Sequence, residues 1–119
     1  MATKISRVEV LSLKLAFDKP FRIALGEIHS SENVLVRLHD NEGFTGLGEA
    51  SPLWSIAGET RAIVLESARA LGSIMLGKNP LAIAERMHEL DRFLAHNTTA
   101  KSAFDIALYD LASRHAGMP

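Results

Sequence analysis

The chain has 119 residues, no cysteine and a formal net charge of −1, with 13 Lys and Arg against 14 Asp and Glu. This balance leaves no basic field for nucleic acid or an anionic membrane surface. The lack of cysteine excludes a disulfide framework, a Cys-bound zinc and a thiol nucleophile. One domain fits this length, whereas a domain with a complete barrel of about 250 residues does not.

The location of the protein is expected to be cytoplasmic. The N-terminal residues show no apolar signal-peptide core, and no run of the chain approaches the length of a membrane span. The absence of cysteine fits a reducing compartment.

The first half of the chain has the alternating pattern of β-strands. A long strand is predicted over residues 5–15, where the slip at Val10 and Leu11 suggests a β-bulge. A turn signal follows at residues 17–21. A second strand, a hairpin turn and a third strand are predicted at residues 33–38, 40–43 and 44–48. We therefore predict a three-stranded antiparallel meander.

The period becomes helical after Gly58, where three apolar stripes step by four, three and four residues. Gly77 is predicted to stop the first helix, Pro80 to start the second in its first turn, and Asn97 or Thr98 to cap the third. The stripes are Val64, Ala68, Leu71 and Met75; Ile83, Met87, Leu90 and Leu94; and Ala100, Phe104, Ala107 and Leu111. Strands followed by helices indicate an α+β fold with the helices on one face of the sheet.

The third helix is apolar on more than one side, since Ile106, Leu108 and Tyr109 join its stripe. Such a helix needs cover on several sides, which three strands and two helices do not supply. We expect a missing partner, either another chain or more of the same one. Without it, an exposed apolar patch should cause self-association or bind a hydrophobic dye.

Residues that could carry chemistry are few. No two of the five histidines are spaced as a metal-binding pair, and His115 suits the negative end of the third helix. Glu85 and Glu89 share a helix face, which we interpret as solvated and not as a cation site. Acids and bases four residues apart are expected to pair on the third helix, namely Asp105 or Asp110 with Lys101 or Arg114.

Three glycines, Gly43, Gly46 and Gly48, form G-x-x-G-x-G in the predicted hairpin. The order and the place differ from a dinucleotide-binding loop. We interpret them as points where a neighbouring backbone comes close. Glu49 is then either a structural acid or a domain-interface contact.

Two predicted loops, residues 20–28 and 51–60, are more apolar than loops need to be. Exposed apolar loops usually cover a site or meet a partner, although their side chains can instead fold into the domain's own core. For Phe21 the two alternatives have equal weight. Trp54, the single tryptophan, favours an interface or lid.

These segments together resemble a known family. The motifs, in order, are KPF at residues 19–21, VLVRL at 34–38, GLGEASP at 46–52, GET at 58–60 and AKSAFDIALYDL at 100–111. The chain from Lys4 to Pro119 is similar to the N-terminal capping domain of the enolase superfamily, in its muconate-lactonizing subgroup within the mandelate racemase/muconate lactonizing enzyme family. Within the subgroup it is most similar to dipeptide epimerases.

The resemblance implies that residues 1–97 are a capping domain and residues 98–119 a junction helix leading to a barrel absent from this sequence. In such isomerases the barrel holds Mg²⁺ and the lysines that move the α-proton. It follows that this chain alone is inactive and holds no catalytic residue and no Mg²⁺ ligand. Its partners would be the barrel and a small substrate such as a dipeptide, with homo-oligomerisation open.

The resemblance also implies that the two apolar loops close over the substrate and set specificity. The substrate-binding residues carried over by position are Phe21, Ile23, Leu25, Gly26, Ile28, Leu53, Trp54 and Ile56. Epimerases acting on Ala-Glu can place an arginine at the position of Gly26 or Ile28. Its absence here favours a less acidic, more apolar dipeptide.

Two alternatives stay open. The parent could be a muconate cycloisomerase or an o-succinylbenzoate synthase. The chain could also be a non-enzymatic α+β module that dimerises through its apolar loops and third helix.

Overall fold

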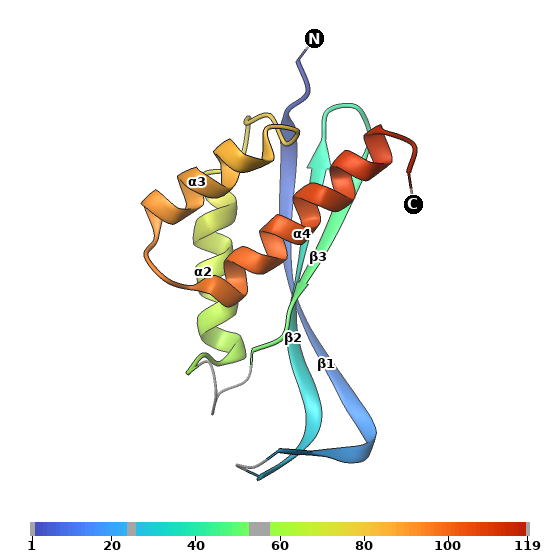
Figure 1. Cartoon of the computed structure of the whole chain (residues 1–119), viewed down its shortest axis with the longest axis vertical. Helices are drawn as coiled ribbons and strands as arrows, with labels where there is room; N and C mark the ends of the chain where they lie inside the picture. The colour runs from blue at the N-terminus through green and yellow to red at the C-terminus, as the bar shows by residue number, and fades with distance from the viewer. Residues whose placement is uncertain (1, 24–25, 53–57, 119) are drawn as a thin grey trace.

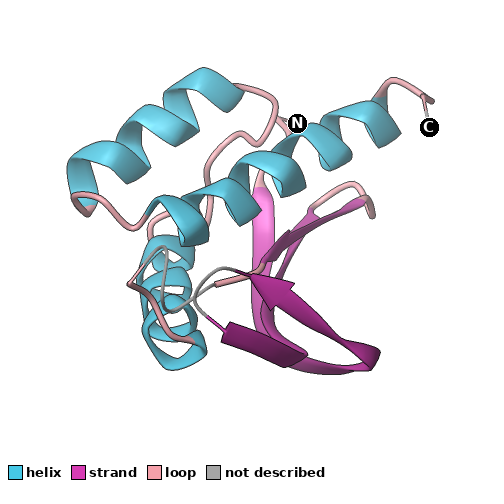
Figure 2. Cartoon of the chain, turned by 60° about the horizontal axis from the view of Figure 1, so that its bottom comes forward, coloured by secondary structure: helices cyan, strands magenta, loops and turns pink. Residues whose placement is uncertain are grey.

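The computed structural model describes residues 2–23, 26–52 and 58–118. The elements, in chain order, are β1 (Ile5–Ile23), β2 (Gly26–Asp40), β3 (Thr45–Ala50), α2 (Arg61–Ser73), α3 (Ile83–Phe93) and α4 (Thr98–His115). The strands form one antiparallel sheet in the order β1-β2-β3, and the helices gather on one of its faces (Figures 1 and 2). The predicted α+β architecture, a meander followed by three helices, is confirmed.

The strands are longer than predicted. The prediction that the chain reverses at residues 17–21 is wrong. Strand pairing is regular up to Ala16 opposite Ser30 and resumes with Phe21 opposite Ile28. Residues 17–20 therefore form an irregular insertion within β1, and the chain reverses between Ile23 and Gly26. As a consequence, most of the predicted loop at residues 20–28 is a two-stranded ribbon.

The predicted bulge at Val10 and Leu11 is also wrong. Val10 and Leu11 pair regularly with Val36 and Leu35, and the register shift lies instead near Ile5. Successive strand residues point to opposite faces. Val10 packs against the core on the helix side, whereas Leu11 is 37% exposed, so apolar residues on both faces explain the apparent slip.

The helix boundaries follow local capping. Thr60 caps α2, because its hydroxyl accepts a hydrogen bond from the Ile63 backbone N–H. Pro80 is not in the first turn of α3, contrary to prediction. The Leu81 N–H donates to Asn79 Oδ1, and this side-chain turn delays the helix until Ile83.

Asn97 stands at the N-cap of α4 as predicted, with φ of 51°, but its side chain makes no capping hydrogen bond. Its Oδ1 instead accepts a hydrogen bond of 2.9 Å from Ser67 on α2. Asn97 therefore ties two helices together.

Two glycines let α4 lie directly on β3. A Cβ at Gly48 would lie 1.8 Å from the Ala103 carbonyl oxygen, and one at Gly46 would lie 2.2 Å from that of Ala107. The prediction of close backbone approach is confirmed for Gly46 and Gly48. It is wrong for Gly43, where a Cβ would meet nothing within 4 Å and the positive φ of 89° in the hairpin turn is what favours glycine. The contact at Gly46 and Gly48 places α4 over the sheet, where its inner side joins a core of Ile5, Val34, Val36, Leu38, Ala50, Val64, Ala68, Leu71, Met75, Leu90, Ala100, Ala103, Phe104, Ala107, Leu108 and Leu111.

Candidate functional site

One end of the molecule projects beyond the helices. β2 is paired on both edges from Val34 to His39, but from Glu32 to Gly26 it is paired only with β1. We call this two-stranded part, residues 14–23 and 26–32, the distal ribbon. It extends along the 51 Å long axis, and the chain leaves β3 for α2 towards the same end (Figure 1). The distal ribbon and the segment after β3 are therefore the candidate site.

The structure brings together the backbones of four of the predicted substrate-binding residues. Phe21 lies opposite Ile28, and Ile23 lies opposite Gly26. For these four residues the description is limited to the backbone. The other predicted residues, Leu25, Leu53, Trp54 and Ile56, lie outside the described residues. The substrate contacts of all eight stay a prediction.

A buried hydrogen bond lies where the ribbon leaves the sheet. Asn33 is 6% exposed, and its Nδ2 donates to Glu49 Oε1 over 2.7 Å. Glu49 therefore acts as a structural acceptor, one of the two roles predicted for it. The bond joins the base of the ribbon to the end of β3, immediately before the second predicted loop.

Pro52 and Glu59 lie near the two ends of the second predicted loop. Pro52 is buried. One carboxylate oxygen of Glu59 is buried and has no hydrogen-bond partner among the described residues. This end of the molecule thus carries a polar group that its own described surroundings leave unsatisfied.

The opposite end of β2 holds a cluster of three titratable side chains. Asp40 Oδ2 lies 2.5 Å from His115 Nε2, and Glu42 Oε2 lies 4.0 Å from the same nitrogen. Burial would raise the pKa of Asp40, but hydrogen bonds from His115 and from the N–H groups of Phe44 and Glu42 outweigh it and lower that pKa. The Phe44 ring lies against His115, with centroids 4.2 Å apart. Asp40 thus fastens the hairpin turn to the end of α4.

This cluster does not fit Mg²⁺. It is the one group of three or more candidate ligands among the described residues. Mg²⁺ favours oxygen ligands in octahedral geometry, whereas one donor here is an imidazole and Asp40 Oδ1 already accepts two backbone N–H groups. The cluster also lies at the other end of β2 from the distal ribbon. This cluster is therefore a poor candidate for a magnesium site.

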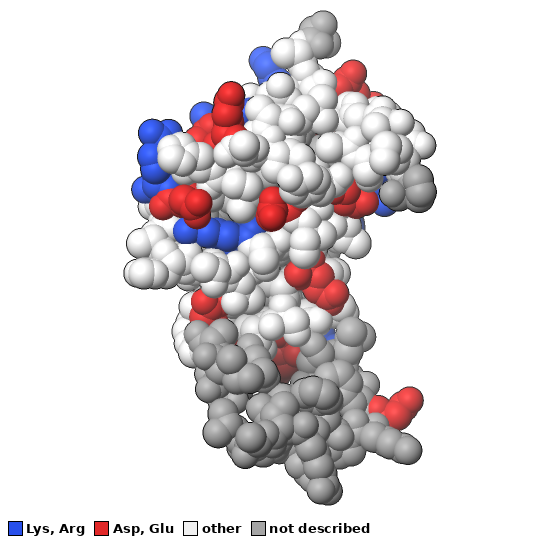
Figure 3. Space-filling model, in the orientation of Figure 1, with Lys and Arg blue, Asp and Glu red and all other residues white. Residues whose placement is uncertain are grey.

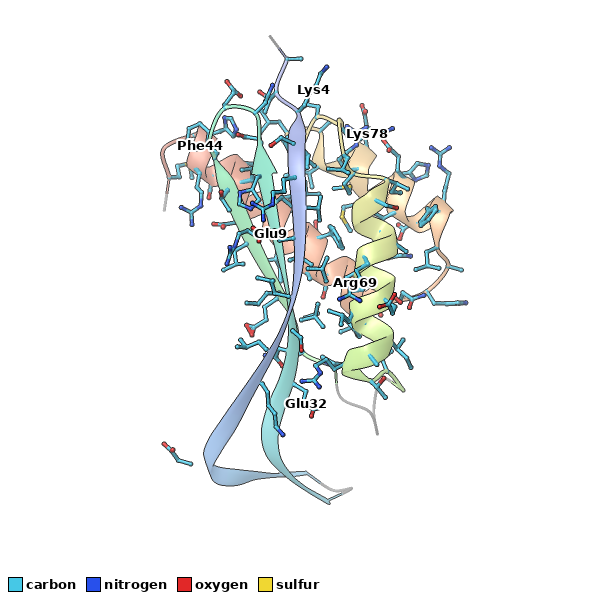
Figure 4. The ribbon with its side chains drawn as sticks, turned by 180° about the vertical axis from the view of Figure 1, so that it is seen from behind. Lys4, Glu9, Glu32, Phe44, Arg69 and Lys78 are labelled. Carbon is cyan, nitrogen blue, oxygen red and sulfur yellow. The ribbon has the colours of Figure 1, made fainter. Side chains whose placement is uncertain are left out.

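A second titratable cluster lies on the face of the sheet away from the helices (Figure 4). Glu9 Oε1 lies 2.5 Å from His39 Nε2, and Arg37 and Arg7 pair with the same carboxylate at 3.4 and 3.2 Å. The hydrogen bond with His39 is the main cause that lowers the pKa of Glu9. Arg37 and His39 lie on β2, whereas Arg7 and Glu9 lie on β1, so the cluster braces these two strands.

Sequence reasoning missed both histidine contacts. Asp40 and His115 are 75 residues apart, and His39 meets Glu9 only through the register of β1 and β2. The available signal was a histidine at a helix end and another in a strand, which suits many surroundings. His115 does lie at the end of α4, as predicted.

The ion pairs of the helices agree only in part with prediction. Asp110 pairs with Arg114 at 3.5 Å, as expected for this spacing, and also accepts a hydrogen bond of 2.8 Å from the Leu47 N–H on β3. Lys101 does not pair with Asp105, because Asp91 on α3 lies 3.0 Å from its ammonium. Packing of α3 against α4 therefore overrides the spacing within one helix.

Glu85 and Glu89 hold a protein cation instead of facing only water. The buried Arg86 hydrogen-bonds Glu89 and lies 3.4 Å from Glu85. The Arg86 hydrogen bond is the main cause that lowers the pKa of Glu89, and Lys78 adds to it. The carboxylate pair is thus part of a structural ion-pair group.

Residues 5–119 match the model of the mandelate racemase/muconate lactonizing enzyme N-terminal domain. The chain belongs to this family. The resemblance to the enolase superfamily is confirmed, since its dipeptide epimerases are among the most similar curated proteins; two chloromuconate cycloisomerases, 27% and 29% identical, also match. A "Hydrophobic dipeptide epimerase" of Enterococcus faecalis is 40% identical over 98% of this chain, and a "D-Ala-D/L-Ala epimerase" of Cytophaga hutchinsonii is 37% identical over 97%.

Solved structures of this family agree with the fold. A dipeptide epimerase from Cytophaga hutchinsonii, complexed with Mg and D-Ala-L-Val, superposes with a TM-score of 0.92 at 36% identity over 95% of this chain. An Enterococcus faecalis dipeptide epimerase, complexed with Mg and L-Leu-L-Tyr, also gives 0.92, at 38% identity over 95%.

The chain spans about a third of these relatives: 33% and 31% of the two curated proteins, and 31% and 32% of the two solved chains. In the family, this segment is the N-terminal domain. No helix among the described residues is long and apolar enough to cross a membrane.

Proposed function

We propose that this chain is the N-terminal specificity domain of a Mg²⁺-dependent dipeptide epimerase. The carrying observation is the match of nearly the whole chain to the N-terminal third of dipeptide epimerases that were solved with Mg and a dipeptide. The distal ribbon and the segment after β3 then form the part that meets the substrate. The reaction is a 1,1-proton transfer, in which the α-proton next to a carboxylate is removed and returned from the other face.

The chemistry belongs to a C-terminal barrel domain beyond this segment. That domain would supply the Mg²⁺ ligands and the proton-transferring side chains, and the cluster of Asp40, Glu42 and His115 is a poor fit for Mg²⁺. Bound Mg²⁺ would stabilise the negative charge that develops when the α-proton leaves. The present chain contributes enclosure and recognition, and we propose that alone it is inactive.

The proposed substrate is an apolar dipeptide. Gly26 and Ile28 occupy the positions where an arginine could pair with an acidic substrate side chain. The similarity supports this choice, since the hydrophobic dipeptide epimerase is 40% identical and an "L-Ala-D/L-Glu epimerase" of Bacillus subtilis is 34% identical. Phe21, Ile23 and Leu25 would provide apolar contacts from the ribbon, and Leu53, Trp54 and Ile56 from the second segment.

The domain boundary at residues 97 and 98 is part of the proposal. α4 would connect the capping domain to the barrel, while its inner side stays in the core that α2 and the sheet share. A cytoplasmic location and homo-oligomerisation stay expectations from the sequence.

The experiment is a dipeptide screen on the full-length product of the gene that encodes this chain. Exchange of the α-proton with solvent deuterium is followed by mass spectrometry for apolar, acidic and basic dipeptides in the presence of Mg²⁺. We expect exchange that is fastest with apolar dipeptides. Turnover of muconates, or of the o-succinylbenzoate precursor, with no dipeptide exchange would instead establish one of the alternative parents.

Two comparisons sharpen this screen. Ile28→Arg should improve the relative rate with an Ala-Glu dipeptide by about tenfold, since one charged hydrogen bond is worth about 1.5–3 kcal/mol. Leu11→Arg, on the sheet face away from the helices, is the matched control and should leave the preference unchanged. Exchange catalysed by the purified 119-residue chain would contradict the assignment of the chemistry to another domain.

A further inference from the structure

The outer edge of β1 lacks a strand partner in the middle of the sheet. The strand order is β1-β2-β3, and β1 pairs with β2 alone. At its start the chain covers this edge itself, because the Ile5 N–H donates to the Lys78 carbonyl and the Gly77 N–H donates to the Ile5 carbonyl, each over 2.8 Å. Farther along, the irregular insertion at residues 17–20 interrupts the strand. The edge between these two places is open.

Strand register shows which backbone groups are open. The Leu47 N–H on β3 donates to Asp110 and therefore points away from β2. Two residues that lie opposite each other either exchange hydrogen bonds or both turn away, and the two kinds of pair alternate along the strands. Arg37, opposite Leu47, therefore turns its backbone groups towards Glu9 on β1. The residues of β1 that turn their N–H and C=O outward are Val8, Val10 and Ser12. No backbone hydrogen bond to these outward groups is found among the described residues.

Residues 7–13 carry little of the protection that edge strands usually have. Proteins blunt an edge with proline, lysine, a bulge or a covering segment. The sequence here, RVEVLSL, contains neither proline nor lysine, and its pairing with β2 is regular. We call residues 7–13, with their outward backbone groups, the open β1 edge. A regular and unpaired edge of this kind is a template for a further strand.

A groove lies beside the open β1 edge on the helix side of the sheet. It has a volume of about 300 Å³, and Val8, Val10, Arg69 and Leu76 are among the residues that line it. Leu76 is 51% exposed. In Figure 4, which shows the molecule from behind, β1 and α2 lie in front of α4. A strand added to β1 would therefore find α2 beside it, where the groove can take up its side chains.

The charges on α2 favour a second copy of this chain as the added strand. Arg69 and Glu66 form an ion pair one turn apart, with 54% and 72% of their side chains exposed. A two-fold axis perpendicular to the sheet at Val10 would place the α2 of the second copy next to the first and in the opposite direction. Each Arg69, which lines the same groove as Val10, would then lie towards Glu66 of the copy. The surface is thus complementary to itself in charge.

The overall charge does not oppose such an association. The formal net charge is −1. Basic and acidic side chains are interspersed over the helical part of the molecule, as seen from the side opposite to the open β1 edge (Figure 3). Proteins stay apart when their net charge is far from zero, so two copies of this chain repel each other weakly.

We propose that the open β1 edge is a self-association surface, on which a second copy of this chain pairs antiparallel about a two-fold axis at Val10. Val10 then lies opposite Val10 of the copy, and Val8 lies opposite Ser12. Each outward N–H meets an outward C=O, which joins two three-stranded sheets into one. The interface is isologous and closed, as in most symmetric dimers. It does not depend on the proposed activity.

Single cysteines test the register, because the chain has no cysteine of its own. Val10→Cys should give a disulfide-linked dimer under mild oxidation, since the two Cα atoms at the axis would lie about 5.5 Å apart. Ser12→Cys is the matched control on the same edge. Its two copies would lie about 13 Å apart along the strands and should not link. An equal mixture of Val8→Cys and Ser12→Cys proteins should link the two variants to each other.

Sedimentation equilibrium measures the association of the 119-residue chain and of the full-length gene product. Val10→Pro removes an outward N–H and leaves the ladder with β2 intact, so dimerisation should weaken at least about tenfold in both proteins. Arg69→Glu places like charges across the axis and should weaken dimerisation about threefold or more. This second variant tests the same surface without changing the backbone of β1. Arg92→Glu makes the same charge change at an exposed position of α3 and should have no effect.

Three outcomes would overturn the proposal. The first is a full-length product that stays monomeric at every concentration, including one whose residues 7–13 resist hydrogen exchange as a monomer, since another segment would then occupy the edge. The second is a dimer that Val10→Pro and Arg69→Glu leave unchanged, which would place the interface elsewhere. The third is linkage of Ser12→Cys as readily as of Val10→Cys, which would contradict the two-fold axis.

Discussion

β2 is one continuous strand, but its two halves differ in how they are paired and covered. In the half nearest the helices, Val34, Val36 and Leu38 are completely buried, and both strand edges are paired. The half in the distal ribbon pairs with β1 alone. Stability therefore concentrates where β3 and α4 cover the strand, which leaves fewer packing constraints on the ribbon, as its proposed role in recognition requires.

Gly48→Ala should produce the largest effect and test the covered half. Its Cβ would overlap the Ala103 carbonyl oxygen, a backbone atom that cannot move without α4. We expect a loss of about 3 kcal/mol or more in the free energy of unfolding, at the upper end of overpacking costs. Urea denaturation followed by circular dichroism measures it.

The control for this substitution is Leu47→Ala on the same strand. Leu47 points to the opposite face and is 43% exposed, so the change should cost less than about 1 kcal/mol. Similar losses for both variants would show that α4 does not depend on the glycine contact.

Periodicity predicted the covered half well and the ribbon poorly. The apolar stripes and the glycines found the elements that pack, because burial imposes regular spacing on residues such as Phe104 and Gly48. In the ribbon, Pro20 and its neighbours are typical of a turn, but in the structure they form an irregular insertion within β1. The ribbon sequence has no regular apolar period, so turn chemistry was the one available signal, and it did not locate the reversal.

The sequence predicted the two segments of the candidate site but not the contacts that hold them together. Order of motifs placed residues 20–28 and 51–60 in one functional unit, and the geometry puts the ribbon and the chain after β3 at the same end. The bond between Asn33 and Glu49 at the base of the ribbon was not predicted. It joins residues 16 apart through strand register, which the sequence does not display.

Asp40→Asn tests the other end of β2 and should cost about 1–2 kcal/mol at neutral pH. The amide keeps an acceptor for the N–H groups of Glu42 and Phe44 but loses the charged partner of His115. The folded state lowers the pKa of Asp40, so the unfolded chain binds more protons in acid. The stabilisation that Asp40 provides is complete when the pH is above the ordinary carboxyl pKa of about 4. It disappears as the pH falls through the lower pKa of the folded state.

The measurement is the free energy of unfolding from urea titrations at several pH values between 7 and 2. The difference between wild type and Asp40→Asn should shrink towards acid. Glu66→Gln is the control, because Glu66 pairs with Arg69 on an exposed helix side and should matter little at any pH. A difference that stays constant with pH would contradict the charged role of Asp40.

Asn33→Ala tests the junction between the two halves. Loss of the hydrogen bond to Glu49 should cost about 1 kcal/mol. Hydrogen exchange should accelerate more in residues 26–32 than in residues 34–39, since the latter are held on both edges. Glu49→Gln keeps an acceptor oxygen and should change exchange less. Uniform acceleration along β2 would mean that the junction does not separate two regions.

The smallest effect on stability is expected from removal of the distal ribbon itself. Replacing residues 17–29 with Asn-Gly would join Ala16 to Ser30, which already pair, through a two-residue hairpin turn. The free energy of unfolding should change by less than about 1 kcal/mol, because none of the core residues that the structure describes lies in the replaced segment and a shorter loop costs less entropy. The same deletion in the full-length protein should abolish dipeptide discrimination while the melting temperature holds. A marked loss of stability would place the ribbon within the folding unit and remove the basis for treating it as a separate recognition element.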